Sequence, residues 1–483
     1  MKPIRLNFLY NLLLNISKVL FPFITAPYIS RILEPEGVGL FNFAITYSAY
    51  FGMLALLGIP TYGTREVAKC REDKAAVTRL MSELISIAVI FTLISTVIYI
   101  ASIATVHKLQ SSYIIFLITG ASLYLAPINI DWYFCGQEEF KYITIRSILI
   151  RAVAIATMFI FVRTKKDLLI YVIINVLAGV ITNIWNYAKL LRSGIRPKLV
   201  FSGLRRHMKP VVTLFASAVA ISIYTVLDTL MLGFIRDDSQ VAFYTCATNI
   251  SKIILTAVTS FSAVAMPRIS YYLEHGMKDT INEIVGKSFS MVGFLAFPAA
   301  IGLCCIAPTF APLFYGGLFD GTIIPLQIMS MVIIMIGLNN LSTCQVLIGL
   351  GRDDLFLYSV CTGAAFNFIA NLLIIPRFGA IGAAATSVAA EFIILVISMV
   401  FVYRHTFVRI HGTGDLLKSM LVPLTFIPLV AVLQRYLDGW ILVAVFCCSG
   451  FVLYVAIQHV MKHSSVKLFE DTVLSKVRER LSR

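Results

Sequence analysis

Residues 81–104 read MSELISIAVIFTLISTVIYIASIA, an almost uncharged run long enough to cross a bilayer. A helix needs about 20 apolar residues to span a hydrocarbon core of roughly 30 Å. The sequence contains about fourteen runs of this kind. Each is continuously apolar and does not alternate apolar with polar residues, which excludes a β-barrel. We therefore predict an all-α polytopic membrane protein with about 14 transmembrane helices, at residues 8–32, 38–60, 81–104, 112–134, 147–162, 168–188, 210–235, 241–267, 288–307, 322–350, 355–375, 380–403, 419–434 and 441–461.

The composition agrees with a chain that is solvated by lipid. Hydrophobic residues make up 59% of the 483 residues and charged residues only 13%, and the mean hydropathy is +0.86. Such a chain has too little polar surface to cover a soluble globule. The first apolar run is too long for a secretory signal and has no small-residue cleavage pattern, so we expect it to be retained as a helix.

The 40 lysine and arginine residues give a net charge of +15 and predict the orientation. If the N-terminus is cytoplasmic, the inner segments carry 29 basic residues and the outer segments carry 8. This asymmetry is the positive-inside rule, and it explains the basic charge without a nucleic-acid partner. We expect both termini to be cytoplasmic. One outer loop, with Arg163, Lys165 and Lys166, opposes the trend, so the pairing of the fourth to sixth spans is the weakest part of this topology.

Motifs for catalysis or for a bound nucleotide or metal are missing from the sequence. It has no GxxxxGK[ST] phosphate loop, no HExxH, no GxSxG and no Cys/His cluster with metal-ligand spacing. The loops are also too short to hold a soluble catalytic domain. We therefore expect a protein that is not an enzyme and uses no cofactor or metal.

Two weak internal matches suggest that the chain is built from two halves. The turn ILEPEGVGLF (32–41) resembles FIRDDSQVAF (234–243), and GQEEF (136–140) resembles GRDDL (351–355). Repeats of this kind are common in transporters. We predict two pseudo-symmetric six-helix lobes at residues 1–205 and 206–405, two further helices at 406–461 and a cytoplasmic amphipathic tail at 462–483.

Several longer stretches carry a family resemblance. The segments PYISRILEPEGVGLFNFA (27–44), LGIPTYGTREVAK (57–69) and DWYFCGQEEFKYITIRS (131–147) resemble the Wzx-type polysaccharide flippases of the multidrug/oligosaccharidyl-lipid/polysaccharide exporter superfamily. DTLMLGF (228–234) and the region from GRDDLFLYS to NLLIIPRFGAIGAAATSVAAE (351–391) resemble the second lobe. The resemblance covers about the first 400 residues and leaves out the last two spans.

This resemblance implies a bacterial inner-membrane protein with a central cavity and alternating access. Its implied cargo is an undecaprenyl-pyrophosphate-linked oligosaccharide of O-antigen or capsule type. Expected partners are this lipid-linked oligosaccharide, membrane lipids, and the polysaccharide polymerase and chain-length machinery, with coupling to H⁺ or Na⁺ as one option. The alternatives are an ion-coupled drug or metabolite antiporter of the same superfamily and a membrane polysaccharide polymerase.

Three basic residues, Lys18, Arg151 and Lys252, lie deep within predicted spans. A charge at the centre of a bilayer costs about 2.5–3.5 kcal/mol on insertion scales, so such residues usually face protein or water on a transport path. We predict that they bind the cargo phosphates in the cavity. The alternatives are snorkelling toward the interface and pairing with neighbouring helices.

Asp228 and Glu391 are the acidic counterparts of these basic residues within the predicted spans. Glu391 follows a run rich in small residues, which allow close helix packing. An unpaired buried carboxyl could carry a proton, so we predict a coupling role for this pair of residues. A fixed ion pair of Glu391 with Lys18 or Lys252 is the equally weighted alternative.

Other polar residues lie at the cavity mouths and along the first helix. Arg31, Arg65 and Arg268 lie next to span ends, where a guanidinium could bind cargo phosphate, although arginines at these positions often serve topology alone. Asn7, Asn11 and Asn15 recur at every fourth position. This spacing predicts a polar stripe on one helix face, suited to a cavity wall or to hydrogen bonding between helices.

Overall fold

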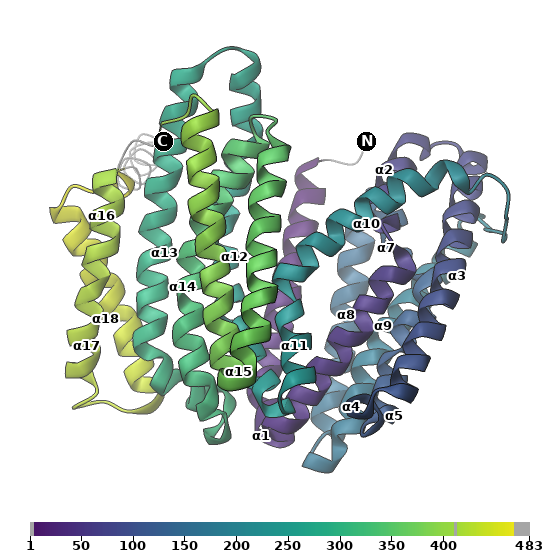
Figure 1. Ribbon diagram of the computed structural model, residues 1–483, viewed down its shortest axis with the longest axis horizontal. Coiled ribbons are helices and arrows are strands. Elements are labelled where there is room, and N and C mark those ends of the chain that lie inside the picture. The colour runs from purple at the N-terminus through teal and green to yellow at the C-terminus, as the bar shows by residue number, and fades with distance from the viewer. Residues whose placement is uncertain (1–3, 410–412, 468–483) are drawn as a thin grey trace, which may run out of the picture. The chain divides into compact units, whose positions relative to one another are not determined.

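The computed structural model describes residues 4–409 and 413–467, and within these ranges every regular element is a helix (Figure 1). The prediction of an all-α polytopic protein is confirmed. Ten helices are long and apolar enough to cross a membrane, or eleven if the bent pair Tyr113–Tyr124 and Ala126–Gly136 forms one span. The predicted amphipathic tail lies largely outside the described residues, which end at 467.

Two of the long helices each contain two predicted spans, joined at a sharp break. α1 (Ile4–Leu56) breaks at Glu34, where φ is 59° and ψ is 175°. Pro35 follows, and its ring disfavours a helical ψ at the preceding residue, whereas the positive φ of Glu34 is a strained angle for a residue with a Cβ. α15 (Asp353–His405) breaks at Gly379, where φ is 53°. Glycine adopts this left-handed conformation without steric cost. Both breaks fall between the predicted spans.

Two compact units divide the chain, unit 1 (Met1–Val241) and unit 2 (Ala242–Arg483). This boundary differs from the predicted one at 205/206, because α10 (Arg205–Thr225) packs on α2 (Ile59–Cys70) and α11 (Leu227–Ile235) packs on α1. The predicted span at 210–235 is thus split between α10 and α11. Both helices belong to unit 1, because they pack on α2 and α1 of that unit. The pseudo-symmetric lobes themselves stay a prediction.

In unit 1, α1 packs against α3 (Lys74–Thr105) and α8 (Phe140–Phe161), and α8 packs against α9 (Leu168–Arg192). The short α4 (His107–Gln110), α5 (Tyr113–Thr119), α6 (Ala121–Tyr124), η1 (Ala126–Ile128) and α7 (Asp131–Gly136) follow α3, and η2 (Lys165–Asp167) precedes α9. α2 lies close to α7, because a Cβ on Gly63 would stand 2.4 Å from the ring of Trp132.

Ion pairs between loops establish which helix ends of unit 1 lie together. Lys165, after α8, binds Glu34 at the break in α1 at 2.7 Å. Arg71, after α2, binds Glu138, before α8, at 2.9 Å. Each pair joins two loops that were expected on the same side of the membrane. These two pairs agree with the expected alternation of the fourth to sixth spans, which stays a prediction.

In unit 2, α13 (Lys278–Tyr315) is the central helix and packs against α14 (Ile323–Asn340), α16 (Thr413–Leu421) and α18 (Gly439–Val460), while α14 packs against α15. α12 (Asp238–Glu274) is tied to α13 by a hydrogen bond from the Tyr315 hydroxyl to the Cys246 carbonyl, 3.0 Å long. The remaining elements are η3 (Gly317–Thr322), the π-helix η4 (Leu341–Ile348), η5 (Val422–Thr425) and α17 (Phe426–Leu433).

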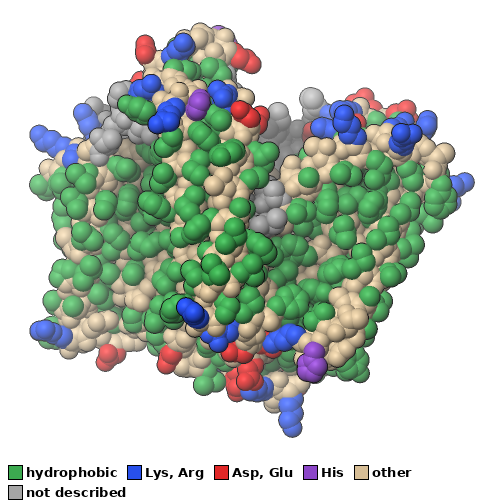
Figure 2. All heavy atoms as spheres, in the orientation of Figure 1, with side chains coloured by type: hydrophobic (Ala, Val, Ile, Leu, Met, Phe, Trp, Pro, Cys, Tyr) green, Lys and Arg blue, Asp and Glu red, His purple; other side chains and the backbone are tan. Residues whose placement is uncertain are grey.

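The outer surface of both units is apolar over most of the length of the helices. Figure 2 shows a broad band of hydrophobic side chains, with charged side chains gathered at the helix ends. Large residues on this band are well exposed, for example Leu93 at 64% and Val97 at 68% on α3. Contiguous apolar surface on this scale is unstable in water, so this band is the surface that lipid covers.

Candidate functional site

The polar face of α1 is one wall of the candidate site in unit 1. Asn11, Asn15 and Lys18 follow one another at spacings of four and three residues and have exposed side chains. The Asn15 side-chain amide donates to Asn11 Oδ1 at 3.4 Å, so this pair bonds within the helix. Lys18 extends the predicted asparagine stripe by one turn. The side chain of Asn7 lies outside the described side chains.

Arg151 of α8 faces α1. Its guanidinium carbon lies 6.0 Å from the centre of the Phe21 ring, at the outer limit of a cation–π contact. Thr144, two turns earlier in α8, donates to the Tyr10 carbonyl of α1 at 2.9 Å and fixes the two helices together. Arg151 and Lys18 therefore lie on two helices that pack directly on each other, and neither belongs to a carboxylate ion pair of the described residues.

Arg146, which the sequence analysis assigned to a loop, is the most buried Lys or Arg among the described side chains of unit 1. The Arg146 side chain is only 2% exposed, and its guanidinium binds Asp131 Oδ1 at 3.0 Å and the side-chain oxygen of Asn186. Asn186 also donates to Asp131 at 2.6 Å and accepts from the Tyr142 hydroxyl at 3.2 Å. This arginine cluster (Asp131, Tyr142, Arg146 and Asn186) joins α7, α8 and α9. Cys135 of α7 lies within electrostatic range of Lys18, Arg146 and Asp131, so Lys18 is near the cluster.

Arg146 was missed because the predicted span began at residue 147, whereas α8 begins at Phe140. The helix can start earlier because Asp131 and Asn186 compensate the charge and hydrogen-bonding needs of the guanidinium. Both partners are distant along the chain, so a hydropathy profile contains no signal for this pairing.

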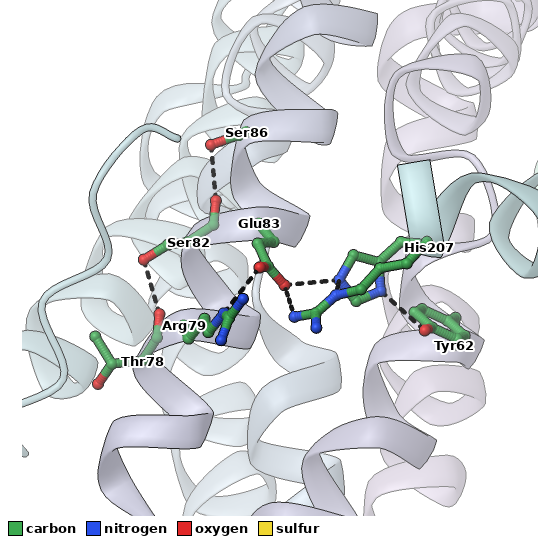
Figure 3. Close-up of polar contacts among 8 residues, drawn as sticks. Tyr62, Thr78, Arg79, Ser82, Glu83, Ser86 and His207 are labelled. Carbon is green, nitrogen blue, oxygen red and sulfur yellow. Dashed lines mark hydrogen bonds and ion pairs between the residues drawn. The ribbon is translucent and has the colours of Figure 1, made fainter. Parts of the chain in front are cut away.

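A second buried cluster holds the segment between α9 and α10 against α3 (Figure 3). The Glu83 side chain is 3% exposed and accepts from Arg79 Nε at 3.2 Å, from His207 Nε2 at 2.8 Å and from Arg206. The other ring nitrogen of His207 bonds the Tyr62 hydroxyl of α2 at 2.9 Å. This glutamate cluster (Tyr62, Arg79, Glu83, Arg206 and His207) attaches the start of α10 to unit 1.

Backbone contacts strengthen the same attachment. The amides of Lys198 and Val200 donate to the hydroxyls of Ser82 and Ser86 at 3.0 and 2.9 Å. Each hydroxyl in turn donates to a carbonyl one turn earlier in α3, as Figure 3 shows. The basic segment at 189–209, which the sequence identifies only by its charge, is therefore a strap bonded along α3.

The three arginines expected at the cavity mouths have different surroundings. Arg31 donates to the Pro27 carbonyl at 2.7 Å within α1. Arg65 binds its neighbour Glu66 at 3.3 Å and lies over the Tyr62 ring at 5.5 Å. Partial burial acts to raise the pKa of Glu66, but hydrogen bonds from Lys69 and Arg65 hold that pKa below its usual value. Arg268 has an exposed side chain on α12 of unit 2.

The two predicted acidic residues lie in different units. Asp228 is buried in α11 of unit 1 and interacts electrostatically with Tyr50, whose hydroxyl donates to the Ser222 carbonyl at 3.0 Å. Glu391 lies on α15 of unit 2, where the Asn339 amide donates to its Oε2 at 2.7 Å. Among the described residues no ion pair reaches Glu391, so its partner is a neutral amide and not Lys252. Lys252 itself is exposed on α12.

The predicted site residues are therefore shared between the units. Unit 1 holds Lys18, Arg31, Arg65, Arg151 and Asp228 together with the asparagine stripe, and unit 2 holds Lys252, Arg268 and Glu391. Lys18 and Arg151 lie on α1 and α8, which pack on each other within unit 1, and Asp228 lies on α11, which also packs on α1. In the described part of the chain, no group of three or more His, Cys, Asp or Glu residues could hold a metal ion.

The family model described as "Polysaccharide biosynthesis protein" matches residues 4–273, more than half of the chain. The chain belongs to this family. The match covers α1 to α12 and so includes Lys18, Arg151, Lys252 and both buried clusters, whereas Glu391 lies beyond it. The predicted resemblance to Wzx-type flippases is confirmed.

Relatives of this polysaccharide biosynthesis family member include proteins named as transporters and flippases. A protein named "Putative O-antigen transporter" from Escherichia coli is 26% identical over 408 residues, which is 83% of this chain and 96% of the relative. "Probable flippase AglR" from Haloferax volcanii is 28% identical over 167 residues, 33% of this chain and 34% of that protein.

Solved structures confirm the fold. "Lipid II flippase MurJ, inward closed conformation" aligns with a TM-score of 0.68 at 15% identity, covering 92% of this chain and 99% of that one. An inward-facing MATE family transporter of the MOP superfamily aligns with a TM-score of 0.59 at 16% identity, covering 80% and 94%. At these identities the likeness supports a shared multi-pass fold of the superfamily and no particular substrate.

Proposed function

We propose that this family member is a flippase that moves an undecaprenyl-pyrophosphate-linked oligosaccharide from the cytoplasmic to the periplasmic leaflet by alternating access. The observation that carries the proposal is the pair of cations on the packed helices α1 and α8, Lys18 and Arg151, placed within membrane-spanning segments. A cation inside a span is costly unless it faces water or an anion, and a pyrophosphate is such an anion. The transporter and flippase names of the relatives favour the same reading.

The same charges argue against the alternatives. Basic residues in the spans would repel the organic cations that many drug antiporters carry. The loops between the predicted spans are too short for a soluble catalytic domain and carry none of the catalytic motifs sought above, so we propose that the protein performs no covalent chemistry on its cargo.

Deletion of the gene tests this function. We expect surface glycan to be lost and the lipid-linked oligosaccharide to accumulate in the cytoplasmic leaflet, detected by mass spectrometry of the lipid fraction. A plasmid copy should reverse both effects. Normal surface glycan with a new sensitivity to drugs would contradict the flippase proposal and support the antiporter.

We also propose that both termini are cytoplasmic in the bacterial inner membrane. The proposal rests on the excess of basic residues at 189–209, of which Lys189 and Arg206 form ion pairs within unit 1. A reporter fused after residue 200 should give a cytoplasmic signal, and a periplasmic signal there would reverse the orientation.

Glu391 is proposed to couple transport to an ion, either H⁺ or Na⁺. Glu391→Gln keeps the shape of the side chain and an oxygen that can accept from Asn339, but it removes the titratable charge. We expect the rate of flipping to fall roughly tenfold at normal protein level, an increase of about 1.4 kcal/mol in the barrier, because ionisable residues inside membrane segments usually mark the transport path. Glu274→Gln, an exposed acid of the same unit, is the control and should leave the rate unchanged. An unaltered rate and pH dependence in Glu391→Gln would remove this residue from the coupling path.

A further inference from the structure

A groove on the surface of unit 1, between α8 and α9, has a volume of about 360 Å³. The residues of interest along it are Lys141, Tyr142, Ile145, Arg146, Leu149 and Trp185. Lys141, Ile145 and Leu149 succeed one another at every fourth position, so they form one line along α8. Arg151 projects about 200° away from Leu149 around the helix, at 3.6 residues per turn. The groove is therefore on a different face of α8 from the cation that faces α1.

The walls of the groove are apolar and exposed. Ile145 is 45% exposed, Leu149 51% and Trp185 46%. They belong to the apolar band that the bilayer covers, so whatever occupies the groove has hydrocarbon beside it. Tryptophan is enriched where hydrocarbon meets the headgroup region.

Two cations at one end of the groove have capacity left to bind an anion. Arg146 is buried, and its Nε–H has no hydrogen-bond acceptor among the described residues, although its other nitrogens bond Asp131, Asn186 and Ser147. Lys141 is exposed and forms no ion pair within the described chain. The carboxylate of Glu139, which also borders the groove, is already paired with Lys189.

We propose that this groove binds the phosphate headgroup of an anionic phospholipid of the surrounding bilayer, with its acyl chains along Ile145, Leu149 and Trp185. Basic pockets between membrane helices recognise anionic headgroups in this way. The Arg146 Nε–H, which has no acceptor among the described residues, and the neighbouring Lys141 supply the complementary positive charge. A volume of a few hundred Å³ suits a headgroup and is too small for a long oligosaccharide. The lipid is thus a bound component of unit 1 and not the transported cargo.

Tryptophan fluorescence can test the proposal directly. The chain has three tryptophans, of which Trp132 is buried and Trp440 is exposed in unit 2, so Trp440→Phe leaves Trp185 as the lipid-accessible fluorophore. The full chain would be reconstituted in two sets of phosphatidylcholine vesicles, one containing brominated phosphatidylglycerol and the other the same fraction of brominated phosphatidylcholine. We expect the anionic lipid to occupy the site near Trp185 with about fivefold preference, the effect of one basic residue near a lipid surface. Trp185→Phe should abolish the quenching signal.

Matched variants decide whether the groove is responsible. Lys141→Gln should bring the preference close to one, whereas Lys166→Gln, an exposed lysine at the opposite end of α9, should leave it unchanged. Because Lys141 is exposed, its substitution should not disturb the fold, and an unchanged melting temperature of the Lys141→Gln variant checks this. Equal quenching by the two lipids, or a preference that survives Lys141→Gln, would overturn the proposal. If added inorganic phosphate removes the preference for the anionic lipid, the lipid proposal is also overturned, because the site would then bind free phosphate.

Discussion

Cells that carry Lys18→Ala, Arg151→Ala and Lys252→Ala together should deliver less than about a tenth of the wild-type surface glycan, although the protein still inserts. A pyrophosphate that leaves the aqueous interface must meet positive charge, and these residues are the basic side chains placed deep in predicted spans. At an effective dielectric near 20, one opposite charge about 4 Å away contributes roughly 4 kcal/mol of Coulomb attraction. A net loss of only about 1.4 kcal/mol already lowers binding tenfold. The measurement is surface glycan per copy of protein.

Charge-conserving and matched variants separate the effect from a general loss of charge. Lys18→Arg and Lys252→Arg should retain more activity than alanine, and glutamate at either position should abolish it. Lys166→Ala, Arg192→Ala and Lys209→Ala combined remove the same charge from exposed residues outside the predicted site and should transport normally. A wild-type rate of delivery in the Lys18/Arg151/Lys252 variant, at normal expression, would show that the basic-cavity mechanism is wrong.

Asp131→Ala should destabilise unit 1 by about 3 kcal/mol, the lower end of the cost of breaking a buried ion pair. The substitution leaves the 2% exposed Arg146 guanidinium without its carboxylate, while the 45% exposure of the Asp131 side chain lets water compensate part of the loss. Thermal unfolding of the purified protein in detergent, followed by tryptophan fluorescence, measures the change. Glu36→Ala is the control. The Glu36 side chain is 72% exposed and pairs with Lys165 at the surface, so its loss should cost less than about 1 kcal/mol.

The double variant Asp131→Ala with Arg146→Met isolates the pairing. Because the cation that needs a partner is then absent, the double variant should be more stable than Asp131→Ala alone. Two outcomes would contradict this pairing: Asp131→Ala melts like the wild type, or the stability lost by the double variant equals the sum of the losses of Asp131→Ala and Arg146→Met alone. Either result would mean that the two charges do not stabilise each other and that the arginine cluster has another role.

The sequence alone was sufficient for the membrane-spanning architecture. Long apolar runs such as 81–104 have to be helices in lipid, because no water is present to bond their backbone, and this requirement depends only on local composition. Local chemistry also favours the breaks at Glu34 and Gly379, because a proline after the first disfavours a helical ψ there and glycine at the second has wide conformational freedom. The order of the predicted spans predicts that the loops of Lys165 and Glu34 lie on one side and those of Arg71 and Glu138 on the other, and the ion pairs between them agree with this order.

Only the tertiary structure decided which polar residues are compensated and which are open. Asp131, Arg146 and Asn186 come from three helices, and Glu83 meets His207 across more than a hundred residues of chain, so neither cluster leaves a periodic signal. The same contacts attach the strap and α10 to unit 1, and move the boundary of the compact units beyond the predicted 205/206. Hydropathy depends on neighbouring residues, whereas the pairing of buried charges depends on which distant helices pack together. The sequence could therefore indicate Lys18 and Arg151 as unusual charges, but not Arg146, whose burial becomes tolerable only through its partners.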